Sequence, residues 1–144
     1  MVLSSVILFS AGVGIPLMAA INAGLGQRIG SPAVAVFILS CVAAMVSGAL
    51  LCVGTLPEMR SITSAPIGYY LGGVFFILYI FSITALAPKF GLGNAIFFVL
   101  LGQLFSAVAI DHFGLFRLPV NTISIKRAIG LLLMGLGVYL VVKK

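Results

Sequence analysis

The chain has 144 residues, of which 62% are hydrophobic and only 7% are charged, and its mean hydropathy is +1.35. A soluble domain carries about 25% charged residues, and a chain this short would leave much of its apolar surface in water, which excludes a water-soluble globular fold. The net charge of +6 comes from Lys and Arg scattered singly or in pairs between apolar runs, a pattern that favours anchoring at a membrane surface over nucleic-acid binding.

Charged residues divide the chain into apolar windows. A membrane-spanning helix needs about 20 apolar residues, so each of four windows holds one helix, and a fifth holds one if Lys126 and Arg127 extend to the interface. The predicted helices are approximately 4–26, 32–54, 67–87, 94–112 and 124–142. The runs are continuously apolar rather than alternating, which excludes membrane strands. We predict an all-α integral membrane protein, with residues 1–144 forming a single five-helix transmembrane domain.

The first helix combines a proline with a polar residue. Its start lacks the positive segment of a signal peptide, so we expect it to be retained. Pro16 removes a backbone donor and frees the carbonyl of Gly12, which predicts a kink. Asn22 follows six residues later. Kinked helices at membrane depth often line a cavity, so Asn22 is a candidate for substrate contact. A packing kink without function is the alternative.

Turn residues mark the other helix ends. Ser31 and Pro32 are typical of an N-cap and the first helical position of the second helix. Pro66 precedes the third helix, and Asn94 is a candidate cap for the fourth. Gly114 is a candidate for the left-handed residue that ends the fourth helix.

The third and fourth helices contain the remaining cavity candidates. Gln103 lies about halfway along the fourth helix, and Ser106 lies one turn further. An unpaired amide in hydrocarbon costs several kcal/mol, so Gln103 should face protein or a wet cavity. It either contacts substrate or forms an interhelical hydrogen bond. Tyr79, in the middle of the third helix, lines the cavity or serves packing.

Asp111 and His112 fall at the C-terminal end of the fourth helix. A carboxylate there opposes the helix dipole, whereas a protonated histidine suits it. One interpretation is a gate or a proton-linked switch, since histidine titrates near neutrality. The other is an interfacial cap or a loop salt bridge to Arg117.

No Asp, Glu, Lys or Arg lies deep within a predicted helix, and no nucleophile–base pair or metal-ligand spacing is present. We therefore expect neither an enzyme nor a metal or cofactor site. A membrane carboxylate commonly binds organic cations in exchange for protons, so its absence disfavours a carboxylate-driven cation antiporter.

The positive charges favour neither orientation in the membrane. With five helices the termini lie on opposite sides, and each side holds four of the eight Lys and Arg residues. One side has Arg60, Arg117, Lys126 and Arg127, and the other has Arg28, Lys89, Lys143 and Lys144. Because the difference between sides sets orientation, the chain either inserts in both orientations and forms an antiparallel dimer, or is oriented by its first helix or a partner chain.

Several segments resemble the YdcZ-like family of small bacterial membrane proteins, in the drug/metabolite transporter superfamily. These are residues 12–26, 102–106, 111–116 and 127–130. The resemblance implies a five-helix half of a ten-helix transporter, acting as an antiparallel dimer with a site between the halves. Its motif positions here are Pro16, Asn22, Gln103, Ser106, Asp111 and His112.

Together these features predict a multi-pass protein of the bacterial inner membrane. We expect a secondary transporter of small organic solutes that works by alternating access, with an identical or homologous chain as its partner. A passive channel and a non-transporting subunit that stabilises a partner are the alternatives.

Overall fold

The computed structural model of the protein describes residues 2–54, 58 and 62–142. Within these residues it contains helices and connections but no strand, which confirms the all-α prediction. The elements are α1 (Val2–Ile29), α2 (Pro32–Val53), η1 (Ile67–Leu71), α4 (Gly72–Phe90), α5 (Leu92–Phe113), η2 (Leu115–Arg117) and α6 (Ile125–Val142).

In the described part of the chain, five helical stretches are long and apolar enough to cross a membrane. Four of them are α1, α2, α5 and α6, and the fifth is formed by η1 and α4 together, from Ile67 to Phe90. Every predicted helix end lies within three residues of an observed one. α1 continues through Pro16 without interruption, so this proline does not break the helix.

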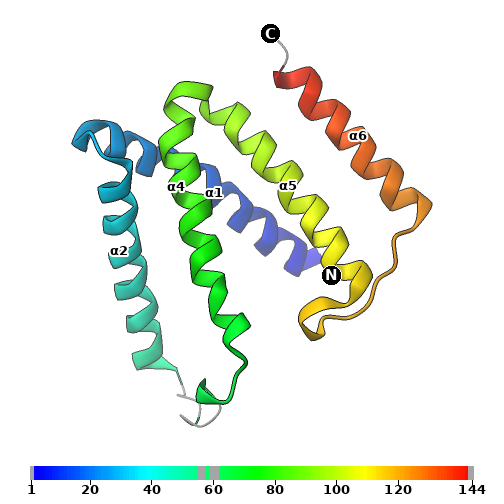
Figure 1. Cartoon of the computed structure of the whole chain (residues 1–144), viewed down its shortest axis with the longest axis horizontal. Helices are drawn as coiled ribbons and strands as arrows, with labels where there is room; N and C mark the ends of the chain where they lie inside the picture. Colours follow the sequence, from blue (N-terminus) through cyan, green and yellow to red (C-terminus); the bar gives the residue numbers. More distant parts are fainter. Residues whose placement is uncertain (1, 55–57, 59–61, 143–144) are drawn as a thin grey trace. The chain divides into compact units, whose positions relative to one another are not determined.

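The chain comprises two compact units, Met1–Lys89 and Phe90–Lys144, which we describe separately. The first contains α1, α2 and α4, and the second contains α5 and α6 (Figure 1). The prediction of a single five-helix domain stays a prediction.

The start of α2 agrees with the expected cap. Ser31 has an extended backbone, and its hydroxyl accepts a hydrogen bond from the Val34 N–H at 3.3 Å. Pro32 occupies the first helical position, where its missing N–H leaves no bond unmade. Gly30 provides the positive φ, +77°, that lets the chain turn between α1 and α2.

The predicted cap at Asn94 is wrong. α5 begins at Leu92 after Gly91, which has a φ of +88° and provides no side-chain cap. The helix therefore starts two residues earlier than expected, and Asn94 lies inside its first turn. From there its amide reaches back and donates to the Phe90 carbonyl at 3.0 Å. At the other end of α5, Gly114 adopts the left-handed conformation, as predicted.

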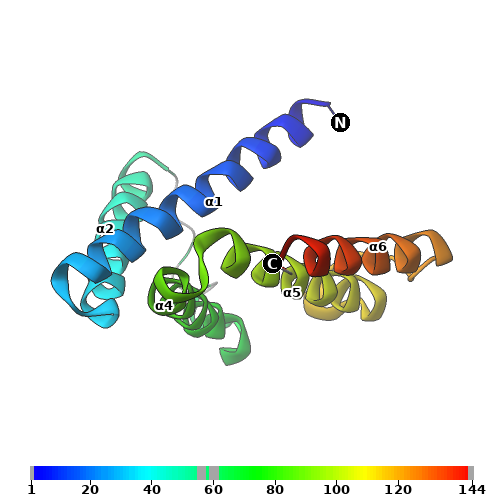
Figure 2. The same ribbon diagram turned by 90° about the horizontal axis from the view of Figure 1, so that it is seen from above.

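The core of the first unit consists of small and aliphatic side chains where α1, α2 and α4 meet. The buried members are Ala19, Ala23, Ala35, Val36, Ile80, Ile83 and Ala87. Figure 2 shows the C-terminal half of α1 against α2, while its N-terminal half projects past that helix. Small side chains allow such close approach between membrane helices, where apolar burial from water provides no driving force.

The second unit is an α5–α6 hairpin (Figure 1). Between the first half of α5 and the last half of α6 lies an apolar groove of about 350 Å³. It is lined by Phe98, Leu101, Gly135, Val138, Tyr139 and Val142. The loop that joins the two helices lies at the opposite end of the hairpin.

Candidate functional site

Asn22 is a buried contact between α1 and α4. Its amide nitrogen donates to the Thr84 hydroxyl at 2.7 Å, and that hydroxyl in turn donates to the Ile80 carbonyl at 2.6 Å. Only 2% of Asn22 and 1% of Thr84 is exposed. The amide thus has a partner inside the first unit, as an interhelical hydrogen bond requires. A role for Asn22 in substrate contact stays a prediction.

Close packing surrounds this hydrogen bond. A methyl group added at Gly26 would lie 3.1 Å from Thr84 Cγ2 and 3.4 Å from Pro32 Cα. By contrast, a methyl group added at Gly24 would meet nothing within 4 Å. The glycine at position 26 therefore lets α1 approach α2 and α4, and the Asn22–Thr84 bond lies in a closely packed part of the first unit.

The polar residues of α5 differ from this buried pair. Gln103 and Ser106 are both exposed, and no residue in the described part of the chain forms a hydrogen bond with either side chain. Three residues apart on a helix, they lie on the same face. Gly102 beside them also has open space, with nothing within 4 Å of an added methyl group. This polar face of α5 is available to a group from outside the second unit.

Other serines of the membrane helices show why the free hydroxyl of Ser106 is unusual. Ser10, Ser40 and Ser82 each donate to the carbonyl four residues earlier, at 2.9, 2.9 and 2.7 Å. Such bonds satisfy a hydroxyl within its own helix. Ser106 has the same option but makes no such bond in α5.

Tyr79 presents a further polar group without a partner. Its side chain is half-buried in α4, and its hydroxyl is enclosed. Among the described residues, no group hydrogen-bonds to this hydroxyl. An enclosed hydroxyl without a bond costs free energy, so Tyr79 remains a candidate for contact with a bound solute or water.

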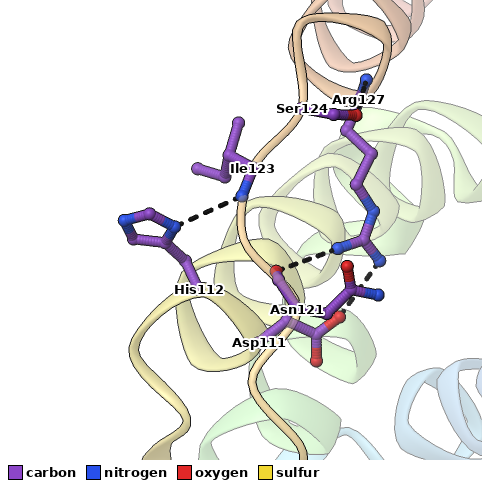
Figure 3. Close-up of polar contacts among 6 residues, drawn as sticks. All are labelled: Asp111, His112, Asn121, Ile123, Ser124 and Arg127. Carbon is purple, nitrogen blue, oxygen red and sulfur yellow. Dashed lines mark hydrogen bonds and ion pairs between the residues drawn. The ribbon is translucent and has the colours of Figure 1, made fainter.

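Asp111 forms an ion pair at the end of α5, and its partner among the described side chains is Arg127 rather than the Arg117 expected from the sequence. Its Oδ2 lies 3.1 Å from Nη2 of Arg127, in the first turn of α6. The same guanidinium donates through Nη1 to the Asn121 carbonyl at 3.3 Å, and the Asn121 N–H donates to the Asp111 carbonyl at 2.9 Å. The pair thus joins α5, the α5–α6 connection and α6 (Figure 3).

His112 holds the connection at a second point. Its Nδ1 accepts a hydrogen bond from the Ile123 N–H at 3.3 Å. Figure 3 shows His112 and Asp111 on opposite sides of the connection, so that adjacent residues of α5 straddle it. Ser124 follows and accepts from the Arg127 N–H at 3.3 Å, which caps α6. We call these contacts of Asp111, His112, Asn121, Ile123 and Arg127 the hairpin clasp.

The structure therefore brings the predicted site residues together in part. Gln103 and Ser106 share one face of α5, and Asp111 and His112 share the clasp, whereas Asn22 pairs with Thr84 instead of another candidate. The predicted salt-bridge partner, Arg117, has a side chain outside the described part of the structure. Sequence reasoning missed Thr84 and Arg127 as partners, although each is a polar residue bordering or interrupting an apolar run.

Comparison with known proteins identifies one family. The sequence model described as "Putative inner membrane exporter, YdcZ" matches residues 3–140, which is nearly the whole chain. Comparisons with curated proteins and with solved structures found no match. Apart from Val2 and residues 141–142, the matched region includes all five membrane-length helices, and it includes every candidate residue described above.

Proposed function

Because the chain belongs to the YdcZ family of inner membrane exporters, we propose that it is a secondary transporter of small organic solutes, working by alternating access as an antiparallel dimer. The protein is a multi-pass protein of the inner membrane, and its family supports a role in membrane transport. The observation that carries the proposal is the polar face of α5. Gln103 and Ser106 present free hydrogen-bonding groups from a helix of membrane-spanning length.

Neutral polar groups suit a solute recognised by hydrogen bonds. The chain has only two acidic residues, Glu58 and Asp111, and neither lies deep within a spanning helix. Asp111 is also already paired with Arg127. An organic cation would lack a membrane-embedded carboxylate to bind. The substrate class that fits best is an uncharged or weakly polar organic solute, with Gln103 as the principal contact and no covalent chemistry.

Two features support the proposed dimer, namely the balanced positive charge and the unsatisfied polar face of α5. Equal positive charge on the two sides removes the usual bias towards one orientation. Two copies in opposite orientations form an inverted repeat, an architecture on which many transporters are built, with the substrate site near the midplane between repeats. In our proposal the polar face of α5 in each copy borders that site.

Flux through liposomes distinguishes the proposed transporter from its alternatives. Purified protein is reconstituted, and counterflow is measured for a panel of labelled uncharged and weakly polar organic solutes. Saturable exchange supports a transporter, whereas fast flow that does not saturate indicates a passive channel. Absence of flux for every solute indicates a non-transporting subunit.

Two serine substitutions then test the polar face by a matched comparison. We expect Ser106→Ala to lower the exchange rate by about two- to tenfold, the effect of losing one net hydrogen bond. Ser40→Ala removes a hydroxyl already bonded to its own helix and should leave exchange unchanged. Equal rates for the two variants would contradict a role for the α5 face in binding.

Gln103→Leu separates substrate contact from dimer formation. Loss of exchange with an intact dimer, measured by crosslinking in membranes, supports substrate contact by Gln103. Loss of the dimer together with exchange would assign the amide to an interhelical hydrogen bond instead.

A further inference from the structure

In the hairpin clasp, two backbone N–H groups of the α5–α6 connection donate hydrogen bonds to the end of α5, and their two acceptors differ in chemistry. The Asn121 N–H donates to the Asp111 carbonyl, an acceptor that does not titrate. The Ile123 N–H donates to Nδ1 of His112, an acceptor that does. One attachment is therefore insensitive to pH, and the other exists only while the imidazole is neutral.

A histidine nitrogen accepts a hydrogen bond only when it carries no proton. The observed contact therefore requires the neutral ring with its proton on Nε2. When a hydronium ion transfers its proton to the Nδ1 lone pair, one O–H bond breaks, one N–H bond forms and water is released. Nδ1–H and the Ile123 N–H are then two donors that face each other. Because His112 is only half-buried at the end of a spanning helix, its ring is within reach of water.

The charged groups around His112 should keep the rest of the hairpin clasp intact when the imidazole is protonated. On α5 the neighbouring Asp111 lies across the connection and is held by Arg127 of α6 (Figure 3). Lys126, the other described cationic side chain at this end of α6, is exposed. A protonated His112 would compete with Arg127 for one carboxylate, but the guanidinium already has a second anchor in the Asn121 carbonyl.

From this geometry we propose that His112 is a proton-sensitive latch on the α5–α6 hairpin. The neutral ring holds Ile123 against the end of α5, and protonation releases Ile123 while the Asp111–Arg127 pair remains. Ile123 directly precedes Ser124, the residue that caps α6, so its release frees the chain entering that helix. A coupling of this release to transport rests on the proposed function. The latch itself does not.

The sequence provides an unusually clean way to observe the latch. His112 is the only histidine of the chain, so every imidazole signal belongs to it. Thr122–Ile123 is the only Thr–Ile pair in the sequence, so ¹³C-carbonyl threonine combined with ¹⁵N isoleucine labels a single amide, that of Ile123. Both groups can be followed by NMR in the full chain in lipid nanodiscs, from about pH 8 to about pH 5.

We expect the ring to carry its proton on Nε2 at the upper pH, and the Ile123 amide signal to shift with the same midpoint as the imidazole signals. Two variants provide reference signals for the bound and the released Ile123 amide. His112→Asn places an amide oxygen near the position of Nδ1 and does not titrate, so its Ile123 signal should stay at the bound position throughout. His112→Leu has no acceptor and should show the released position at every pH.

Hydrogen exchange gives the size of the effect. At the lower pH we expect the Ile123 amide of the wild-type chain to exchange about two- to tenfold faster than in His112→Asn, the range expected for one net hydrogen bond. A ring protonated on Nδ1 at the upper pH, or an Ile123 signal that ignores the imidazole titration, would overturn the latch. A wild-type titration of Ile123 in His112→Asn would overturn it as well.

Transport is measured separately, so that the two proposals fail independently. If a solute is exchanged, the rate of the wild-type chain should depend on pH across the imidazole titration, whereas that of His112→Asn should not. Equal pH dependence in both chains would overturn the coupling while the NMR result still decides the latch. Absence of exchange for every solute would overturn the proposed function and the coupling together, again without changing the NMR result.

Discussion

At the scale of single residues, the membrane helices separate polar groups that are satisfied from those that are not. Serines 10, 40 and 82 bond to their own helices, and Asn22 bonds to Thr84 across a helix contact. Gln103, Ser106 and Tyr79 have no such partner among the described residues. Because an unsatisfied polar group in hydrocarbon costs several kcal/mol, we expect the second set to meet a solute, water or a partner chain. The first set is satisfied within the chain, and the Asn22–Thr84 bond joins two helices.

A double-mutant cycle on Asn22 and Thr84 tests this division. Asn22→Ala and Thr84→Val each remove the hydrogen bond, and we expect a coupling free energy of about 0.6 to 1.7 kcal/mol, as measured for polar pairs between membrane helices. The measurement is unfolding in mixed detergent micelles, followed by circular dichroism. Additive effects would show that the bond contributes nothing to stability. Loss of exchange in Asn22→Ala without loss in Thr84→Val would instead support substrate contact by Asn22.

At the scale of elements, the α5–α6 hairpin depends on a sharply turned connection. Gly114 ends α5 with a φ of +59°, and a methyl group added there would lie 2.5 Å from Val120 Cγ2. Phe116, two residues later, also has a positive φ, +58°. These turns return the chain along the end of α5, where Asp111 and His112 can hold it.

Gly114→Ala should destabilise this hairpin. A left-handed alanine costs about 1–2 kcal/mol, and the collision with Val120 adds to that figure. Gly93→Ala is the matched control on the same helix, because its added methyl group meets nothing within 4 Å. Alanine favours a helix over glycine by up to about 1 kcal/mol, so the control should be as stable as the wild type or more so. Equal thermal midpoints in detergent for both variants would contradict this role for Gly114.

At the scale of the whole molecule, we expect the distribution of positive charge to set the orientation in which each copy inserts. Each side of the membrane holds four Lys or Arg residues by the predicted topology. A transporter assembled from two opposed copies needs both orientations in the same membrane. The ratio of the two orientations should therefore change when a single positive charge is removed.

Two charge-neutralising substitutions should shift orientation in opposite directions. Arg28→Gln leaves three positive charges on the side of the C-terminus against four, so more C-termini should be exported. Arg60→Gln leaves three on the other side, so more C-termini should remain in the cytoplasm. C-terminal fusions to alkaline phosphatase, active outside, and to green fluorescent protein, fluorescent inside, measure the two populations. The wild-type chain should give both signals, and a signal from one compartment only would contradict the antiparallel homodimer.

The helices and most of their ends were predictable because they depend on residues that are close together in the sequence. Bilayer thickness sets the length of an apolar run, and caps such as Ser31 and Gly114 act on neighbouring residues. Asn94 shows the limit of this reasoning, since the positive φ of Gly91 moved the start of α5 and left the asparagine inside the helix. The candidate site was predictable only as a set of polar positions.

The sequence alone thus determined that this protein lies in a membrane, where its five spanning helices run and which polar residues they contain. These properties depend only on the positions of charged residues and the lengths of apolar runs along the chain. Only the tertiary structure decided which of those residues are paired. Asn22 and Thr84 are 62 residues apart, and Asp111 and Arg127 are 16 apart. Such pairs form only when the rotation of each helix about its axis and the path of a loop bring the groups within hydrogen-bonding distance. Neither property can be inferred from the residues of one helix.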